Sequence, residues 1–412
     1  MTIVGDVEIP TLSEDAIRAA AREVVQLSVP HLAPGGKTLA YILPQSARIG
    51  HFGLETQIIS TLFEDEYDRI LIFTDKMSWP GTNPWIRQCA SSKFRFIEVD
   101  NFDVLLLGTK DAGFHRIGSL DCLFASPRAI FIRFYRHILA GGAVKYLELP
   151  EEAESIARET LSRRGIDPDA PFVFFHNRTL SYVPTMTYHA YRTAVVETYQ
   201  PAIRRLIEAG YRVIRIGEPG LDTMGFPPDA YVNIPDWEDV DRAVDLFVLA
   251  RNAFGLAQNS GPIWVAGAFG RPVLRTNAPF EHMNMPYNDD LTLFKHYHVA
   301  GSAEPMAYRQ ILDAGIPAIL FSEKIAEAGY EVRDNTPDEL LAATEELLTR
   351  MAGTWQRDVE ADSAFRALGA DYEARIAADP AMQASNFAFY GYAHPFGSLA
   401  RVTLETQPGF LD

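Results

Sequence analysis

Short apolar runs alternate with helical segments along the chain, and this pattern predicts parallel sheets joined by helical crossovers. Each apolar run is only a few residues long and ends in turn-type residues, as a buried strand does. The first part of the chain predicts strands at 38–44, 69–74 and 94–99, and helices at 13–27, 54–65 and 150–165. Residues 100–140 show no clear period and predict no particular element.

A polar stretch at 165–171 precedes a second round of the same alternation. The fold class predicted is therefore α/β, with two Rossmann-like domains in tandem and a cleft between them. The expected domains are 1–165 and 166–380, followed by a C-terminal tail, 381–412, that packs on a domain or crosses back to the first one. The second round predicts strands at 172–176, 211–217, 231–234, 253–258 and 272–276, and helices at 201–210, 239–252, 261–270 and 337–351.

Charge narrows the range of partners. The 412-residue chain has a net charge of −17, so nucleic acid and anionic membranes are not expected to bind it, because both need clustered basic residues.

No stretch is apolar enough for a transmembrane helix, and the start of the chain lacks the apolar core of a signal peptide. Cys89 and Cys122 have no metal-type spacing. The expected location is the cytoplasm.

Ligands of open parallel sheets bind beyond the carboxyl ends of strands, where helix N-termini offer N–H groups. This rule first selects 258-QNSGP-262, in which Gln258, Asn259 and Ser260 separate a strand from a helix that starts at Gly261. A diphosphate suits this position. The alternative is that Asn259 or Ser260 only caps the helix.

The same rule selects 176-HNR-178, where Arg178 could pair with a phosphate and His176 could bind a ligand or brace the loop. A purely structural histidine is the alternative.

A third candidate is 214-IRIGEPG-220, in which Gly217 frees the backbone, Glu218 suits a ribose or base, and Arg215 adds a cation. A plain turn explains this loop equally well.

The first domain offers 48-RIGHFG-53, with His51 between Gly50 and Gly53. A neutral imidazole can take a proton from an acceptor hydroxyl, so His51 is the candidate general base. Glu55 is a second candidate base. The alternatives are a histidine that caps the next helix and a glutamate that lies on the surface or caps.

The connection 179–200 is longer than most, and it is expected to shape a pocket through Tyr182, Tyr188 and His189. Asp-x-Asp triplets occur at 167–169 and 239–241, but the first precedes a predicted strand and the second lies in a predicted helix. No required metal or other cofactor is predicted.

Several motifs in a fixed order resemble a bacterial family of proposed glycosyltransferases. The resemblance covers roughly residues 40–350 and is carried by these segments: 48-RIGHFGLE-55, 176-HNR-178, 199-YQPAIRRLIEAGYRVIRIGEP-219, 236-DWEDVDRAVDLFVLARNAFGLAQNSGPIWVAGAFGRPVLRTNAP-279 and 335-NTPDEL-340. It implies a GT-B arrangement, in which the C-terminal domain binds a nucleotide-sugar donor and the N-terminal domain serves the acceptor.

His-x-Arg and Gln-Asn-Ser-Gly-Pro are also distantly similar to motifs of GDP-fucose-dependent fucosyltransferases. That likeness implies Arg178 as a ligand of the donor diphosphate, with Ser260 and Gly261 as its backbone partners. Two departures stand out. Thr179 and Leu180 follow where relatives tend to carry an acidic residue, and Gln258 precedes Asn-Ser-Gly where relatives often have Thr-Ser-Gly.

The function expected is metal-independent transfer of a hexosyl or deoxyhexosyl group from a nucleotide diphosphate sugar, GDP-linked by the fucosyltransferase likeness, to a hydroxyl of a small molecule or glycan. One alternative is a nucleotide-sugar epimerase, which needs several acid/base carboxylates. The other is a noncatalytic sugar- or nucleotide-binding protein. Nucleotide, sugar, acceptor, stereochemistry and oligomeric state stay open.

Overall fold

The computed structural model describes residues 2–4, 7–9, 12–76, 83–179, 187–220, 224–281, 289–319, 321–379 and 397–412. The chain divides into two compact units, Met1–Ala153 and Glu154–Asp412, which we call unit 1 and unit 2. This division falls near the beginning of helix α5 (Glu151–Arg163), whereas the sequence placed the expected domain boundary after that helix.

Unit 1 contains a five-stranded sheet in the order β5-β4-β3-β7-β6, parallel except for the edge strand β6. The order reverses beside β3, since β4 and β5 continue on one side and β7 lies on the other. The elements of unit 1 are β1 Thr2–Val4, β2 Val7–Ile9, α1 Glu14–Ser28, β3 Thr38–Ile42, α2 Ile49–Phe63, β4 Arg69–Asp75, β5 Phe94–Val99, α3 Phe102–Leu107, β6 Gly113–Ile117, β7 Leu120–Phe124 and α4 Pro127–Leu139.

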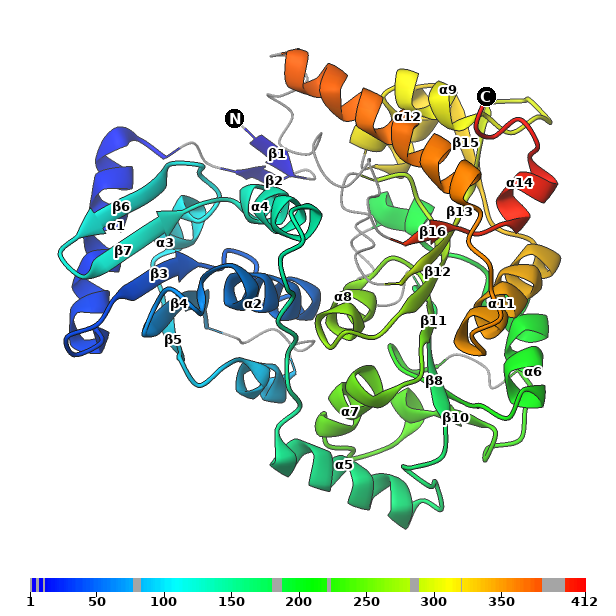
Figure 1. Cartoon of the computed structure of the whole chain (residues 1–412), viewed down its shortest axis with the longest axis horizontal. Coiled ribbons are helices and arrows are strands. Elements are labelled where there is room, and N and C mark those ends of the chain that lie inside the picture. Colours follow the sequence, from blue (N-terminus) through cyan, green and yellow to red (C-terminus); the bar gives the residue numbers. More distant parts are fainter. Residues whose placement is uncertain are drawn as a thin grey trace. The chain divides into compact units, whose positions relative to one another are not determined.

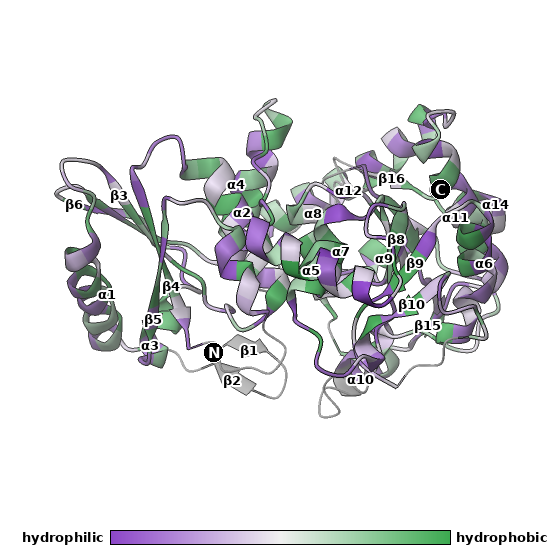
Figure 2. Cartoon of the chain, turned by 90° about the horizontal axis from the view of Figure 1, so that it is seen from below, coloured by the Kyte–Doolittle hydropathy of each residue, from purple (hydrophilic) through white to green (hydrophobic). Residues whose placement is uncertain are grey.

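Helices cover both faces of this sheet, with α1 and α3 on one side and α2 and α4 on the other (Figures 1 and 2). The strands β3 and β7 are buried along their whole length, as expected of parallel strands covered on both faces. Helix α1 shows hydrophobic and hydrophilic residues in turn in Figure 2, because Ala20 and Val24 join the core while other positions face solvent.

Unit 2 contains a seven-stranded parallel sheet in the order β10-β9-β8-β11-β12-β13-β16. Its first six strands follow the 3-2-1-4-5-6 order of a Rossmann fold. The elements of unit 2 after α5 are β8 Phe172–His176, α6 Gln200–Glu208, β9 Arg212–Arg215, β10 Tyr231–Asn233, α7 Ala243–Arg251, β11 Gly255–Ala257, α8 Gly261–Ala268, β12 Val273–Ala278, β13 Leu291–Phe294, β14 His296–Val299, α9 Tyr308–Asp313, α10 Ser322–Glu327, β15 Tyr330–Arg333, α11 Pro337–Met351, α12 Val359–Ala378, β16 Ser398–Leu399 and α14 Val402–Thr406.

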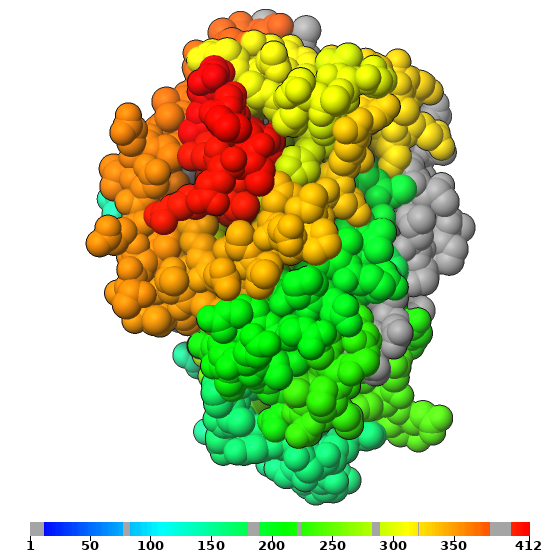
Figure 3. All heavy atoms as spheres, turned by 90° about the vertical axis from the view of Figure 1, so that its right-hand side faces the viewer, coloured from blue at the N-terminus to red at the C-terminus, as the bar shows by residue number. Residues whose placement is uncertain are grey.

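Helices also flank both faces of the unit 2 sheet, with α7 and α8 on one side and α6 and α11 on the other (Figure 1). The described end of the tail belongs to this unit, since β16 pairs with β13 and Phe410 joins a buried aromatic cluster. Figure 3 shows this C-terminal segment, in red, on the surface against the yellow and orange parts of the same unit.

The α/β class and the parallel strands predicted from the sequence are confirmed, and β5, β8 and α11 have the predicted bounds. Two expectations were wrong. Helix α2 begins at Ile49 rather than at residue 54, so His51 lies in its first turn. Asp239 and Asp241 precede helix α7 instead of lying inside it, and Asp241 Oδ1 accepts a hydrogen bond from the N–H of Ala243.

Candidate functional site

The candidate residues of unit 2 meet at the point where its strand order reverses. Asn177 and Arg178 follow β8, and Gln258, Asn259 and Ser260 follow the neighbouring strand β11. In open α/β sheets this switch point is where ligands bind, outside the carboxyl ends of the strands. The sheet therefore brings together two segments that lie some 80 residues apart in the sequence.

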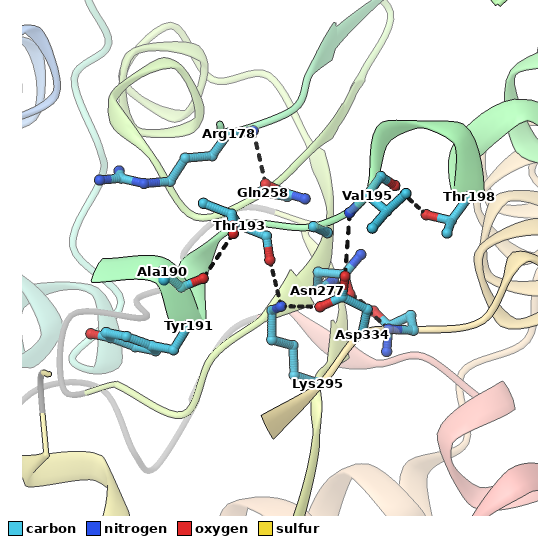
Figure 4. A network of polar contacts seen from close by, with 12 residues as sticks. Arg178, Ala190, Tyr191, Thr193, Val195, Thr198, Gln258, Asn277, Lys295 and Asp334 are labelled. Carbon is cyan, nitrogen blue, oxygen red and sulfur yellow. Dashed lines mark hydrogen bonds and ion pairs between the residues drawn. The ribbon is translucent and has the colours of Figure 1, made fainter. Parts of the chain in front are cut away.

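Arg178 is the cation at this edge. Its backbone N–H donates to Gln258 Oε1 at 2.8 Å, and Figure 4 shows its side chain extending away from Gln258. Among the described residues, no hydrogen bond or ion pair holds its guanidinium. Burial lowers the pKa of Arg178, and so does the charge of Arg192, while Glu281 and Glu218 act in the opposite sense. A half-buried guanidinium without a contact partner is well suited to an anionic ligand.

Glu218 follows the next strand, β9, and it belongs to the same edge. Its Oε2 atom is buried and has no hydrogen-bond partner in the described part of the chain. Burial raises the pKa of this carboxyl, although Arg215 and Arg178 lower it. A buried carboxylate oxygen without a partner costs free energy unless a ligand donates to it, as ribose hydroxyls do.

The start of helix α8 completes the edge. Ser260 is the N-cap residue, yet its hydroxyl caps no helical N–H, and the alternative that it serves only as a cap is therefore wrong. Ser260 Oγ and Asn259 Oδ1 are both buried and lack partners among the described residues. Together with the N–H group of Gly261, they form the polar N-terminal end of the eight-residue helix α8, beside the switch point.

The side-chain amide of Gln258 forms hydrogen bonds with other residues of the protein, so it is not available to a ligand. It is fully buried, and its Nε2 group donates to Asn177 Oδ1 at 2.9 Å and to the hydroxyl of Tyr199 at 3.2 Å. Asn277 Nδ2 donates to the same hydroxyl at 2.9 Å. This network joins β8, β11 and β12, and it fixes the backbone of Arg178.

His176 and Arg215 are also bound inside unit 2. The Nδ1–H group of His176 donates to the carbonyl of Ile216 at 3.1 Å, because a carbonyl can only accept. The guanidinium of Arg215 donates to Asn233 Oδ1 at 2.6 Å and to the carbonyl of Glu218. Both side chains are buried and hold the Glu218 loop in place.

The motif 335-NTPDEL-340 has a structural explanation. Asn335 and Asn277 exchange backbone-to-side-chain hydrogen bonds of 2.6 and 2.7 Å, which tie the start of α11 to the end of β12. Thr336 and Glu339 form a capping box at the N-terminus of α11. The motif thus anchors the helix behind the site.

The connection after Arg178 is described in part. Tyr182 lies outside the described residues, and so does the side chain of Tyr188. The ring of His189 stacks on Phe321, with centroids 6.3 Å apart and planes at 6°. Beyond His189, the connection lines a hollow of about 360 Å³.

Two functional candidates in this hollow were missed from the sequence, Lys295 and Asp334. Lys295 directly follows β13, so the rule of strand ends would have selected it if that four-residue strand had been predicted. Asp334 follows β15, which pairs antiparallel with β14 in a separate two-stranded sheet, so the rule for parallel strands would not have selected it.

The buried imidazole of His176 predicts a pH-dependent stability. Burial lowers the pKa of His176 to about 4, whereas an unfolded histidine titrates near 6.5. Between about pH 6.5 and pH 4, this histidine binds a proton in the unfolded chain but not in the folded chain. The free energy of unfolding therefore falls as the pH falls through this range, by up to about 3 kcal/mol. Urea titrations at pH 7 and pH 4.5 should show a smaller decrease for His176→Gln. An equal decrease in both proteins would contradict the assignment.

The Glu218 loop predicts a contrast between two glycines. Gly217 has φ +128°, and a Cβ atom there would meet His176 Nδ1 at 2.9 Å, whereas Gly220 has φ +82° and open space around it. Gly220→Ala should cost about 1 kcal/mol of backbone strain, and Gly217→Ala about 2–3 kcal/mol because the clash adds to the strain. Thermal unfolding measures both. Equal losses would show that His176 does not restrict this turn.

Unit 1 holds a second cluster, near the carboxyl end of β3 in its five-stranded sheet. Glu55 is fully buried, so the expectation of a surface carboxylate was wrong. It accepts hydrogen bonds from His51 Nδ1 at 2.8 Å and from the Tyr41 hydroxyl at 2.7 Å. The His51 side chain is 11% exposed, and its Nε2 atom has no partner among the described residues. Gly50 and Gly53 are buried in the same turns of α2.

This arrangement is that of a histidine base held by a carboxylate. With its proton on Nδ1 and bound to Glu55, a neutral imidazole directs the Nε2 lone pair outward, where it can take a proton. Tyr41 occupies the second oxygen of Glu55 and limits its rotation. Tyr41 lies inside a uniformly apolar strand, and no signal in the sequence pointed to it.

Within the described residues, no group of three or more His, Cys, Asp or Glu side chains could hold a metal ion. No helix in that part of the chain has the length and apolar character needed to span a membrane.

Comparison with known proteins gives structural likenesses. No protein-family model and no curated protein matches the chain. One similar solved structure is a glycosyl transferase family 9 protein of Veillonella parvula DSM 2008, with 13% identity over 63% of this chain and 86% of that chain and a TM-score of 0.39. A second is the heptosyltransferase WaaC of E. coli with ADP-2-deoxy-2-fluoro heptose, with 10% identity over 62% of this chain and 92% of that chain and a TM-score of 0.35. A third is the iron-containing dodecameric glycosyltransferase TibC of enterotoxigenic E. coli H10407, with 14% identity over 59% of this chain and 58% of that chain and a TM-score of 0.30. All three are glycosyltransferases.

The chain spans only 58% of the TibC chain.

Proposed function

We propose that the protein is a glycosyltransferase that moves a sugar from a nucleotide diphosphate sugar to a hydroxyl group. The observation that carries this proposal is a set of polar groups at the switch point of unit 2 that have no hydrogen-bond partner among the described residues: the half-buried guanidinium of Arg178 and the buried atoms Glu218 Oε2, Asn259 Oδ1 and Ser260 Oγ. Their chemistry matches the parts of a nucleoside diphosphate. A cation and a helix N-terminus suit the diphosphate, and a carboxylate suits the ribose hydroxyls.

The reaction follows from these groups. The acceptor oxygen forms a bond to the anomeric carbon of the sugar, and the bond from that carbon to the diphosphate oxygen breaks. The negative charge that develops on the diphosphate is stabilised by Arg178 and by the N–H groups at Ser260 and Gly261. The acceptor proton passes to Nε2 of His51, whose Nδ1–H group stays bound to Glu55.

The dyad of His51 and Glu55 favours an enzyme over a noncatalytic binding protein. A binding protein has no need to hold an imidazole in one tautomer with a buried carboxylate. In this proposal His51 is the general base, so the departure at Thr179 does not leave the reaction without one.

The proposal is tested by thermal unfolding with GDP, UDP, ADP, CMP and dTDP and their common sugar conjugates, ADP-heptose included. A ligand that binds only the folded state raises the melting temperature in proportion to the logarithm of its concentration over Kd. We expect one nucleoside diphosphate and its sugar conjugate to shift the melting temperature. No shift with any ligand at millimolar concentration would refute the proposal. Isomerisation of a bound donor without acceptor would favour an epimerase instead.

A further inference from the structure

The hollow beside Arg178 lies within unit 2 and holds charged groups that the proposed reaction does not use. It measures about 360 Å³, which is in the size range of small-molecule pockets. Its walls come from three parts of the unit: the connection after β8, the end of β13 and the end of β15. The lining residues are Arg178, Thr179, Ala190, Tyr191, Thr193, Ala194, Val195, Lys295, Val332 and Asp334.

Lys295 is buried and lines this hollow. Its ammonium group donates to the carbonyl of Thr193 at 2.6 Å and pairs with Asp334 Oδ1 (Figure 4). An ammonium has three N–H groups, so one of them has no partner among the described residues. Burial lowers the pKa of Lys295, and Asp334 raises it. A buried ammonium N–H without a partner costs free energy, so this group favours a ligand that offers an acceptor oxygen.

Asp334 balances the charge of Lys295, and both of its carboxylate oxygens have partners within the protein. Its Oδ1 atom pairs with Lys295 and its Oδ2 atom accepts from the N–H of Val195 at 3.3 Å. The pair is thus neutral overall. Among the described residues, the only other charged side chain that lines the hollow is Arg178, whose contact partner in the proposed function is the diphosphate. The hollow does not require an acidic ligand.

The remaining walls are mixed. Val195, Val332 and two alanines offer methyl groups, while Thr193 and Lys295 offer polar atoms. A sugar has the same mixture, since its C–H groups suit apolar walls and its hydroxyls need a few placed hydrogen-bond partners. An apolar ligand would leave the spare N–H of Lys295 unpaired.

We infer that this hollow binds the neutral glycosyl group of the donor, and that Lys295 donates its third N–H to an oxygen of that sugar. The position supports this, because Arg178 lies on the wall of the hollow and also holds the diphosphate to which the sugar is attached. Lys295 is then a residue that determines sugar specificity. The inference rests on the proposed function.

The test compares two ligands on the double variant Lys295→Met with Asp334→Asn, which removes both charges together. Titration calorimetry is run with the nucleoside diphosphate found by thermal unfolding and with its sugar conjugate. The diphosphate should bind within about twofold of its normal Kd. The conjugate should bind about 10–100-fold more weakly, as expected for the loss of a hydrogen bond from a charged donor.

A second variant distinguishes loss of sugar binding from a folding defect of the double variant. Val195 is 56% exposed and contributes its backbone N–H to Asp334, so Val195→Trp keeps the ion pair and adds bulk to the hollow. It should also weaken the sugar conjugate and spare the diphosphate. Arg309→Ala, an exposed arginine of the same unit, should change neither.

The outcomes separate the two proposals. Equal weakening of both ligands, or no change in either, would overturn the sugar-binding role while the nucleotide site stands. Absence of any nucleotide binding by the unaltered protein would overturn the proposed function, and the sugar site with it.

Discussion

Arg178→Ala is expected to lower kcat for glycosyl transfer by about 10²–10³-fold, because it removes a cation that acts on charge developing in the transition state. The loss should exceed that of an ordinary surface arginine, since the guanidinium is half-buried and free of protein partners within the described chain. The same variant should abolish the rise in melting temperature caused by the nucleoside diphosphate. Steady-state kinetics and thermal unfolding measure the two effects on one protein preparation.

Two controls make this result specific. Arg178→Lys keeps the charge but loses the planar fork, so it should recover part of the activity. Arg309→Ala removes one exposed charge from unit 2 and should leave kcat unchanged. If Arg178→Ala still binds the diphosphate with unaltered affinity, Arg178 is not its ligand.

The sequence predicted the ends of the central strands well, and with them the candidate residues. Strands β3 and β8 are buried and apolar throughout, so the point where polarity returns marks the carboxyl edge of each sheet. Arg178 and His51 were found in this way. The hydrogen-bond partners of a polar side chain were not predictable. Arg178, Arg215 and Gln258 look equally polar in the sequence, but within the described chain only the Arg178 side chain has no partner.

Elements without a hydrophobic period escaped prediction. Strand β6 is an edge strand exposed over most of its length, so it shows no alternation. Its partner β7 is fully buried but contains Asp121, whose charge is satisfied by Arg116, directly opposite on β6, and by Tyr67, which lies 54 residues away in the sequence. These contacts depend on tertiary structure. Likewise, Gly50 and Gly53 suggested a loop, yet helix α2 is buried on nearly every side and includes both.

Replacement of His51 by alanine is the other change with a large expected effect. Loss of a positioned general base should lower kcat by about 10²–10⁴-fold, while the Kd of the nucleoside diphosphate should stay the same because its proposed site consists of unit 2 residues. His115→Ala, an exposed histidine of unit 1, is the matched control and should retain full activity. Because Glu55 loses a partner in His51→Ala, the free energy of unfolding is measured alongside the kinetics.

Glu55 and Tyr41 should act only through His51. Glu55→Gln replaces the carboxylate that holds Nδ1–H, so transfer should slow by about 10–10²-fold, and Tyr41→Phe should have a smaller effect because the Glu55–His51 contact survives it. The double variant His51→Ala with Glu55→Gln should be no slower than His51→Ala alone, since residues that act as a unit are not additive. Multiplying losses would mean that Glu55 acts independently of the imidazole. An unimpaired His51→Ala enzyme would instead place the base on another residue, and Glu218, whose carboxyl has a pKa raised by burial, would then be the first to replace.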